Sequence, residues 1–374
     1  MSEESKHPAP RRVLSGMRPT GKLHLGNYMG ALKNWVDLQN ATRADGAPKY
    51  ECYFFIADYH ALTTDYADTS GLKENVREVA LDFLAAGLDP NRCTIFVQSK
   101  VPAHAELALL LGMITPLSWL ERVPSYKDQQ EQLKEKDLAT FGFLGYPLLM
   151  SADILLYQPD FVPVGQDQAA HVEITREIAR RFNLFYGPKS ASVTRRVADS
   201  SSDKEKMVAL EDEPRTYAAI LPEPKVLLTP SPKLPGTDGR KMSKSYGNTI
   251  LLSDPETDIR AKLKTMVTDP ARIRRTDAGN PDVCPVFDLH KVFSSQQTQT
   301  EVRAGCTSAG IGCIQCKGWL ADAVVKELAP IQQRRQHFEA NPEEVKAALE
   351  RGAVCARERA EVTMQQVRSA VRLR

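Results

Sequence analysis

Two lysine side chains lie three residues apart in a short stretch of small and polar residues. Residues 239–245 read G-R-K-M-S-K-S, so two serine hydroxyls accompany Lys241 and Lys244, and Gly236 lies just upstream. Glycine frees the backbone, so the stretch is interpreted as a mobile loop. Two ammonium groups on such a loop suit a polyphosphate whose negative charge rises during a reaction. A solvated basic turn is the commoner meaning of two lysines at this spacing alone.

A second candidate phosphate site lies at the start of the first expected helix. Residues 24–27 read H-L-G-N and follow a short expected strand and a turn. The free N–H groups and the positive dipole end of a helix N-terminus attract phosphate. His24 and Asn27 add hydrogen-bond donors, and Gly26 lets an adenine ring approach the backbone. Alone, a histidine at a helix start is more often a cap. Residues 16–22 nearly spell a P-loop, but Leu23 then replaces its magnesium-binding hydroxyl.

One carboxylate lies in an otherwise apolar expected helix. Residues 146–157 read Y-P-L-L-M-S-A-D-I-L-L-Y, and the aspartate is Asp153. Burying a carboxylate costs free energy unless it has a partner. The alternative is a solvated aspartate on a helix surface, and the apolar neighbours argue against it. Met150 and Tyr146, one and two turns upstream of Asp153, are expected near the same face.

Four of the seven cysteines crowd into 33 residues with the spacing C-x21-C-x6-C-x2-C. They are Cys284, Cys306, Cys313 and Cys316. Four thiols in a reducing compartment favour a metal or cluster over disulfides. Structural zinc usually shows two C-x-x-C pairs, and this chain has one. Zinc and free thiols remain as alternatives. The other cysteines, Cys52, Cys93 and Cys355, are expected to be buried.

Strands and helices alternate through the first half of the chain. Strands are expected at 12–15, 50–57, 94–98 and 161–165, with helices at 25–39, 72–86, 103–113, 141–157 and 167–182. This alternation predicts an α/β fold with a parallel, doubly wound sheet, whose ligands bind at the carboxyl ends of the strands. Three further helices are expected at 253–267, 316–337 and 342–373, so the second half is helical.

The bulk composition is that of an ordinary globular chain. The net charge of +2 over 374 residues excludes a bulk basic field, so any nucleic-acid contact must be local. No apolar run approaches the ~18–20 residues of a membrane span, and residues 1–12 lack the apolar segment of a secretion signal. A cytoplasmic protein without a membrane partner is therefore expected.

The first two motifs resemble one family. K-M-S-K-S resembles the signature loop of class I aminoacyl-tRNA synthetases, and H-L-G-N resembles their H-I-G-H motif, with Asn27 replacing the second histidine. Residues 14–27, 146–157 and 162–171 resemble the bacterial tryptophanyl-tRNA synthetases in particular. The resemblance implies a Rossmann-like catalytic domain and a smaller, all-helical anticodon-binding domain.

It also implies the reaction and the residues for it. ATP and Mg²⁺ would activate L-tryptophan, which would then be transferred to tRNA(Trp). The implied catalytic residues are His24, Asn27, Lys241 and Lys244. The implied ATP site is Arg18, Pro19, Thr20, Gly26, Asn27, Gly165, Gln166, Asp167, Leu234, Lys241, Met242, Ser243, Lys244 and Ser245. Asp153 would accept the indole N–H, with Gln168, Tyr146 and Met150 completing the tryptophan site.

The resemblance extends to the cysteines and the domain plan. Their spacing resembles an iron–sulfur subgroup of the family, which implies a [4Fe–4S] cluster of structural role, with Zn²⁺ as the alternative. The implied plan is a tail (1–11), a catalytic domain (12–251) with an insertion at 188–220, a helical domain (252–328) and C-terminal helices (329–374) that pack back on the catalytic domain. A homodimer is implied as well.

Several alternatives stay open. One is tyrosine specificity on the same fold, and another is a non-catalytic iron–sulfur protein that binds RNA or senses redox state. His60 is either a pocket residue or a structural histidine. Arg272, Arg274 and Arg275 either contact tRNA or form a solvated basic turn. Some members of the family carry a lysine where this chain has Gln129, so this chain lacks that ammonium group.

Overall fold

The computed structural model describes residues 9–123, 138–188, 219–228 and 234–373. Its centre is a five-stranded parallel sheet in the order β3-β2-β1-β4-β5. The strands are β1 (Arg11–Met17), β2 (Tyr50–Ile56), β3 (Thr94–Val97), β4 (Phe161–Val164) and β5 (Lys225–Leu228). In the register of the sheet, Val13 lies opposite Cys52 on one side and Phe161 on the other.

Successive residues of the strands enter two different hydrophobic cores. Val13, Phe54 and Ile95 face the core that α2 (Lys33–Asn40) and α4 (Leu72–Ala86) close. Their neighbours Leu14, Phe55 and Phe96 face the core under α5 (Ala103–Gly112), α9 (Tyr146–Leu156) and α10 (Ala169–Tyr186). This two-residue period buries both faces of the sheet, which is why the strands are almost continuously apolar. The predicted doubly wound α/β fold is confirmed.

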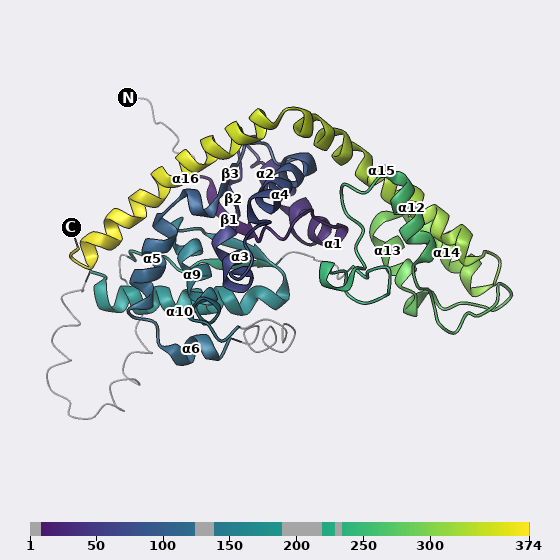
Figure 1. Cartoon of the computed structure of the whole chain (residues 1–374), viewed down its shortest axis with the longest axis horizontal. Coiled ribbons are helices and arrows are strands. Elements are labelled where there is room, and N and C mark those ends of the chain that lie inside the picture. The colour runs from purple at the N-terminus through teal and green to yellow at the C-terminus, as the bar shows by residue number, and fades with distance from the viewer. Residues whose placement is uncertain (1–8, 124–137, 189–218, 229–233, 374) are drawn as a thin grey trace.

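The second half of the chain is helical, as predicted. Its helices are α12 (Glu256–Thr265), α13 (Pro285–Phe293), α14 (Gln296–Thr307), α15 (Cys313–Ala340) and α16 (Pro342–Ala370). Figure 1 shows α15 leading from the helical part toward the sheet, and α16 continuing in the same sweep past the sheet and α5. Gly352 of α16 lies so close to β3 that a Cβ there would come within 1.8 Å of the carbonyl oxygen of Ile95. The chain therefore needs glycine at this contact.

Several predicted elements differ in detail. The helix expected at 25–39 consists of α1 (Leu25–Asn27), a π-helical turn (η1, Tyr28–Leu32) and α2. The helix expected at 141–157 divides at Gly145 into α8 (Phe141–Leu144) and α9. Other elements were missed, the shortest of them because four or five residues carry little periodicity. They are β5, α3 (Asp58–Asp65), α6 (Leu117–Glu121), α13, α14 and the 3₁₀ turns at Gln98–Lys100, Gln166–Gln168, Lys244–Tyr246 and Pro281–Val283.

Two interpretations of single residues were wrong. Cys355 is exposed rather than buried. Arg272 is buried, and its guanidinium donates to the carbonyl oxygens of Arg275 and Ile311, so it does not belong to a solvated turn, whereas Arg274 and Arg275 are exposed. Gln129 and most of the expected insertion at 188–220 lie outside the described residues. In the described part of the chain, no helix is long and apolar enough to cross a membrane.

Candidate active site

A cavity of about 1130 Å³ opens between the carboxyl ends of β1 and β4. The strand order reverses at this point, because the chain continues from β1 to β2 on one side and β4 lies on the other. In doubly wound sheets such a switch point leaves a crevice for ligands. The cavity is lined by the ends of both strands, the turn before α1, one face of α9 and the loop around Met242.

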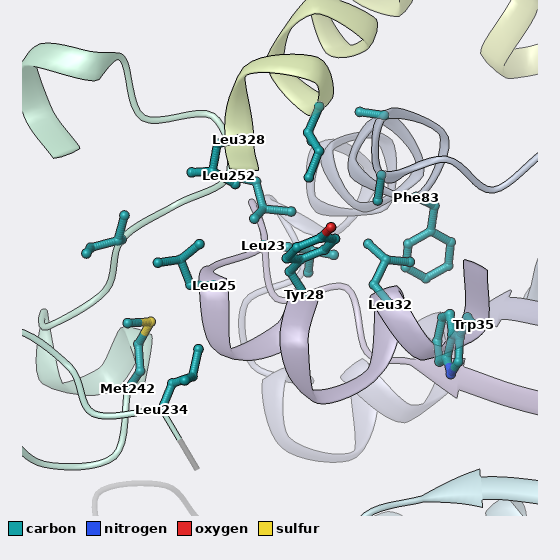
Figure 2. Close-up of a cluster of buried hydrophobic side chains, with 14 of the residues drawn as sticks. Leu23, Leu25, Tyr28, Leu32, Trp35, Phe83, Leu234, Met242, Leu252 and Leu328 are labelled. Atoms are coloured by element: carbon teal, nitrogen blue, oxygen red, sulfur yellow. The ribbon is translucent and has the colours of Figure 1, made fainter. Parts of the chain in front are cut away.

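Backbone pairing brings the two lysine- and histidine-bearing motifs together across more than 200 residues. His24 and Leu251 form an antiparallel bridge, and the N–H of Leu25 donates to the carbonyl oxygen of Ile250 at 3.0 Å. Leu25 and Met242 enter the same hydrophobic cluster beside the sheet (Figure 2). The segment that follows the lysine loop, at Ile250 and Leu251, is therefore hydrogen-bonded to the start of the first helix.

His24 caps α1 in a defined tautomer. The Nδ1 atom of its ring accepts a hydrogen bond from the backbone N–H of Asn27, while the backbone N–H of His24 donates to Oδ1 of Asn27. Burial, and then the positive charges of Lys244 and Lys241, lower the pKa of His24 to about 4. The imidazole is therefore neutral at pH 7, with its proton on Nε2, and the NH₂ of Asn27 remains as a donor. A Cβ on Gly26 would lie 2.9 Å from the imidazole, so glycine makes room for this cap.

The lysine loop is held by one buried asparagine. Asn248 accepts from the N–H of Ser243 at 2.8 Å and donates to Asp238 and to the carbonyl oxygen of Lys241. Gly236 packs directly on the Asn248 amide, where a Cβ would come within 2.3 Å. The glycines thus serve close packing as well as turn geometry.

Lys244 lies at the edge of the cavity rather than in its lining. Its Nζ donates to the carbonyl oxygen of Thr20 at 2.7 Å, next to the turn before His24. Burial lowers the pKa of Lys244 to about 8, although nearby Asp82 acts in the opposite direction. Lys244, Lys241 and the start of α1 give this end of the cavity a positive field that suits phosphate groups.

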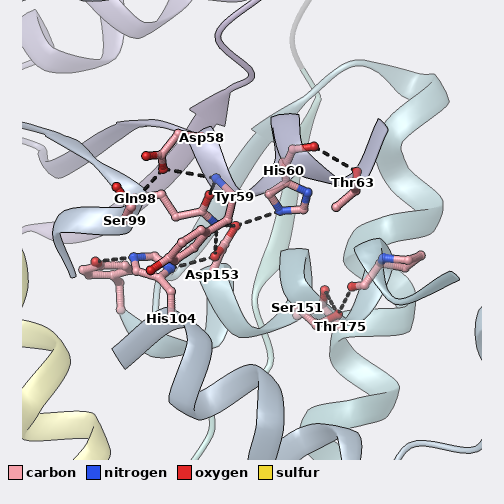
Figure 3. Close-up of polar contacts among 12 residues, drawn as sticks. Asp58, Tyr59, His60, Thr63, Gln98, Ser99, His104, Ser151, Asp153 and Thr175 are labelled. Atoms are coloured by element: carbon pink, nitrogen blue, oxygen red, sulfur yellow. Dashed lines mark hydrogen bonds and ion pairs between the residues drawn. The ribbon is translucent and has the colours of Figure 1, made fainter. Parts of the chain in front are cut away.

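Asp153 lies at the other end, 1% exposed, and receives hydrogen bonds from three side chains. They are His60 of α3, Gln98 of the 3₁₀ turn after β3, and His104 of α5 (Figure 3). Burial disfavours the charged form of Asp153, but His104 and His60 outweigh it and lower the pKa of the carboxyl. The cavity wall therefore contains an ionised, fixed acceptor.

The structure brings most predicted site residues to this one cavity. Its lining includes His24, Asn27, Arg18, Thr20, Gly26, Gly165, Gln166, Leu234, Lys241, Met242, Ser243, Asp153, Gln168, Tyr146, Met150 and His60. Pro19 lines a neighbouring pocket, while Lys244 and Ser245 lie outside the lining. The side chain of Asp167 lies outside the described residues. His60 is both a pocket residue and a structural one, because it also contacts Asp153.

Sequence reasoning missed Gln98, His104 and Asn248. Gln98 follows the last residue of β3, and a polar residue at a strand end was the available signal for it. His104 and Asn248 carried no local signal, because their partners lie far away in the sequence.

The four cysteines are gathered in the helical part. Cys284 precedes α13, Cys306 lies in α14, and Cys313 and Cys316 lie in the first turn of α15. Burial, and then the other three cysteines, raise the pKa of Cys316 to about 12, so the four sulfurs share one neighbourhood. Arg272 and His290 offer N–H groups to Cys306 and Cys316 at 3.7 and 3.4 Å. Among the described residues, no three His, Cys, Asp or Glu side chains already form a metal-binding group.

The chain is similar to known proteins over almost its whole length. A family described as "tRNA synthetases class I (W and Y)" matches residues 6–329. The chain is 48% identical over 403 aligned positions to a tryptophan–tRNA ligase of Ralstonia nicotianae, covering 97% of this chain and 99% of the relative. It is 47% identical to the tryptophan–tRNA ligase of Thermotoga maritima, again over 97% of this chain and 99% of the relative.

Solved structures agree. Tryptophanyl-tRNA synthetase from Campylobacter jejuni, solved with ADP and tryptophan, superposes with a TM-score of 0.78 at 32% identity, over 96% of this chain and 99% of that one. A tyrosyl-tRNA synthetase from Archaeoglobus fulgidus, at 21% identity and a TM-score of 0.58, shares the fold. The chain therefore belongs to the class I tRNA synthetases and, within them, to the tryptophan–tRNA ligases.

Proposed function

We propose that the cavity between β1 and β4 binds ATP at its cationic end and L-tryptophan at its Asp153 end, and joins them as tryptophanyl-adenylate. The observation that carries this proposal is the polarity of the cavity: neutral and cationic donors lie at one end and a buried carboxylate lies at the other. The two ends suit a polyphosphate and an N–H-bearing ring, respectively.

In the first step a tryptophan carboxylate oxygen attacks the α-phosphorus of ATP. The bond from that phosphorus to the bridging oxygen breaks, and pyrophosphate leaves with the electron pair. Lys241 and Lys244 stabilise the charge that grows on the leaving group, and Nε2–H of His24 and the NH₂ of Asn27 donate to the phosphates. Mg²⁺ on the triphosphate would add positive charge at the same oxygens. No protein nucleophile is needed.

The tryptophan end selects the ring. Indole N–H is a donor only, so the matching group is an acceptor, and Asp153 is the buried carboxylate that lines the cavity. Tyr146, Met150 and Gln168 all line the cavity, so Tyr146 and Met150 would wall the ring and Gln168 would hold the amino-acid backbone. In the second step a terminal ribose hydroxyl of tRNA(Trp) attacks the adenylate and AMP leaves. The helical part at 252–328 is then the region that reads the anticodon.

The alkaline pH dependence tests the assignment of Lys244. With a pKa of about 8, its ammonium form is complete below that pH and is lost as the pH rises through it. We therefore expect kcat/KM for ATP in pyrophosphate exchange to fall above about pH 8, while His24 stays neutral throughout. Lys244→Arg is the control, because guanidinium keeps its proton and should remove this fall. An alkaline fall unchanged in Lys244→Arg contradicts the assignment.

The same family resemblance leads us to propose a [4Fe–4S] cluster on Cys284, Cys306, Cys313 and Cys316, with Zn²⁺ as the alternative. Four thiols in one neighbourhood, with N–H groups directed at two of the sulfurs, match the donor set and the hydrogen bonding of such clusters. When bound, the group would fasten α13, α14 and α15 together. Its role is structural, because aminoacylation transfers no electrons.

Metal analysis of anaerobically purified protein tests this. We expect iron and acid-labile sulfide in equal amounts, both lost in Cys313→Ser and retained in Cys355→Ser, whose thiol is exposed and remote in sequence. Zinc without sulfide would support the alternative. A full complement of free thiols in anaerobic protein, with neither metal present, would contradict both.

We also propose that two copies of the chain form a dimer through the corner of α5, α6 and α10. Leu109, Met113 and Leu117 are each more than 60% exposed there. Arg181 of α10 connects this helix to α6, because its guanidinium lies over the ring of Trp119 in α6 and over that of Phe185 in α10. Apolar surface of this kind marks interaction sites. Light scattering that gives the mass of one chain, 41.6 kDa, would contradict a dimer.

A further inference from the structure

The carboxylate of Asp153 is saturated with donors in this structure. Its Oδ1 accepts from Gln98 Nε2 at 2.7 Å and from His104 Nδ1 at 2.6 Å. Its Oδ2 accepts from Gln98 Nε2 at 2.8 Å and from His60 Nε2 at 3.0 Å. Each oxygen thus accepts two contacts, one from a histidine ring and one from the NH₂ of Gln98, which both oxygens share. An indole N–H can bind only if one donor leaves.

Two of the three donors to Asp153, His104 and Gln98, are also held by a second hydrogen bond of their own. His104 is 0% exposed, and its Nε2 lies 2.9 Å from the hydroxyl of Tyr157, which is also fully buried. Gln98 is 0% exposed as well, and its Oε1 accepts from the N–H of Tyr59 at 3.0 Å. These second contacts fix the side chains in place behind Asp153.

His60 differs from the other two donors. It lines the cavity, and among the described residues no hydrogen bond to its Nδ1 is found. Its ring can therefore turn away without breaking a second side-chain contact. Figure 3 shows His60 approaching Asp153 from a different side than Gln98 and His104.

The tautomer of His104 follows from its neighbours. Asp153 is ionised and only accepts, so Nδ1 of His104 carries a proton and donates to it. In neutral imidazole Nε2 must then accept, so the hydroxyl of Tyr157 is its donor. Burial, and then Asp153, raise the pKa of Tyr157 well above its usual value, so that hydroxyl keeps its proton.

We propose that Tyr157 and His104 form a positioning relay for tryptophan recognition: Tyr157 fixes the tautomer of His104, and His104 holds Asp153 oriented and ionised for the indole N–H, which takes the place of His60. The proposal rests on the role of Asp153 proposed above. Neither Tyr157 nor His104 lines the cavity, so they act on the substrate only through Asp153.

Tyr157→Phe removes one hydroxyl and keeps the ring. Without it, the proton of His104 can move to Nε2, and a lone pair on Nδ1 then faces Asp153. We expect KM for tryptophan to rise roughly ten-fold, the effect of about one buried hydrogen bond, with KM for ATP unchanged. The preference for tryptophan over 3-benzothienylalanine, whose sulfur replaces the indole N–H, should fall by a similar factor.

Tyr53→Phe is the matched control. Tyr53 is also buried, and its ring centroid lies 5.2 Å from that of Tyr157, but its hydroxyl donates to Glu51 and not to the relay. Equal changes for tryptophan and the analogue in Tyr157→Phe, or the same loss of preference in Tyr53→Phe, would overturn the relay. A wild-type enzyme that does not prefer tryptophan over the analogue would instead overturn the role of Asp153 itself.

Histidine-selective ¹⁵N NMR provides a second readout on the wild-type protein. The chain has seven histidines, and His60→Asn and His104→Asn assign the two that matter. Added tryptophan should alter the ring signals of His60 and leave the protonated Nδ1 of His104 in place. A His60 ring that stays bonded, with His104 changed instead, would contradict the proposed exchange.

Discussion

Replacing Lys244 by alanine is expected to lower kcat for adenylate formation by a factor on the order of 10²–10³, with tryptophan affinity nearly unchanged. The Lys244 ammonium lies at the turn that precedes His24, so it is placed to meet charge on departing pyrophosphate. That charge develops only in the transition state, and loss of its partner therefore appears in kcat. ATP–pyrophosphate exchange at saturating tryptophan measures the effect, and equilibrium binding measures the affinity.

Lys22→Ala is the control for Lys244→Ala. Lys22 lies in the same turn and is exposed, but it does not line the cavity. The control should keep exchange near the wild-type rate, so a general loss of positive charge is separated from a specific contact. Wild-type turnover in Lys244→Ala would remove Lys244 from the proposed mechanism.

Replacing Asp153 by alanine is expected to abolish tryptophan activation rather than weaken it. The change removes the acceptor for indole N–H and leaves the donors of Gln98, His60 and His104 facing a cavity. Sites built on such a hydrogen bond discriminate by roughly 10⁴–10⁵, so a loss of that order in kcat/KM for tryptophan is expected. Pyrophosphate exchange over a range of tryptophan concentrations measures it.

Folding can be separated from recognition at this site. Asp153→Asn keeps the shape of the side chain, and its thermal unfolding shows whether the fold survives. Asp58→Asn is the matched control, because Asp58 is a buried aspartate nearby that accepts from the N–H groups of Tyr59 and Ser99 and does not line the cavity. Folded Asp153→Asn that activates tryptophan normally would contradict the role of Asp153.

The sequence predicted those features that depend on local pattern. The long apolar run of β2 and the alternation of strands with helices indicated the buried parallel sheet. Motifs with a fixed spacing, such as residues 24–27 and 241–245, located the cationic end of the cavity. Asp153 was found because a carboxylate among apolar residues needs partners.

The partners of these residues could not be predicted in the same way. Asn248 holds the lysine loop by contacts that only the folded loop defines. His104 and Gln98 reach Asp153 across 49 and 55 residues of sequence, and no periodicity encodes such distances. Arg272 was misread for the same reason, because the backbone carbonyls that bury it come together only in the folded helical part.

Amino-acid-dependent ATP–pyrophosphate exchange, run separately with tryptophan, tyrosine and the other standard amino acids, is the most direct test that this cavity activates tryptophan. We expect exchange with tryptophan alone, because only the two-ring indole combines an N–H donor for Asp153 with the large apolar surface that the cavity wall of Tyr146 and Met150 suits. Exchange with tyrosine, or none with any amino acid in folded protein, would contradict it.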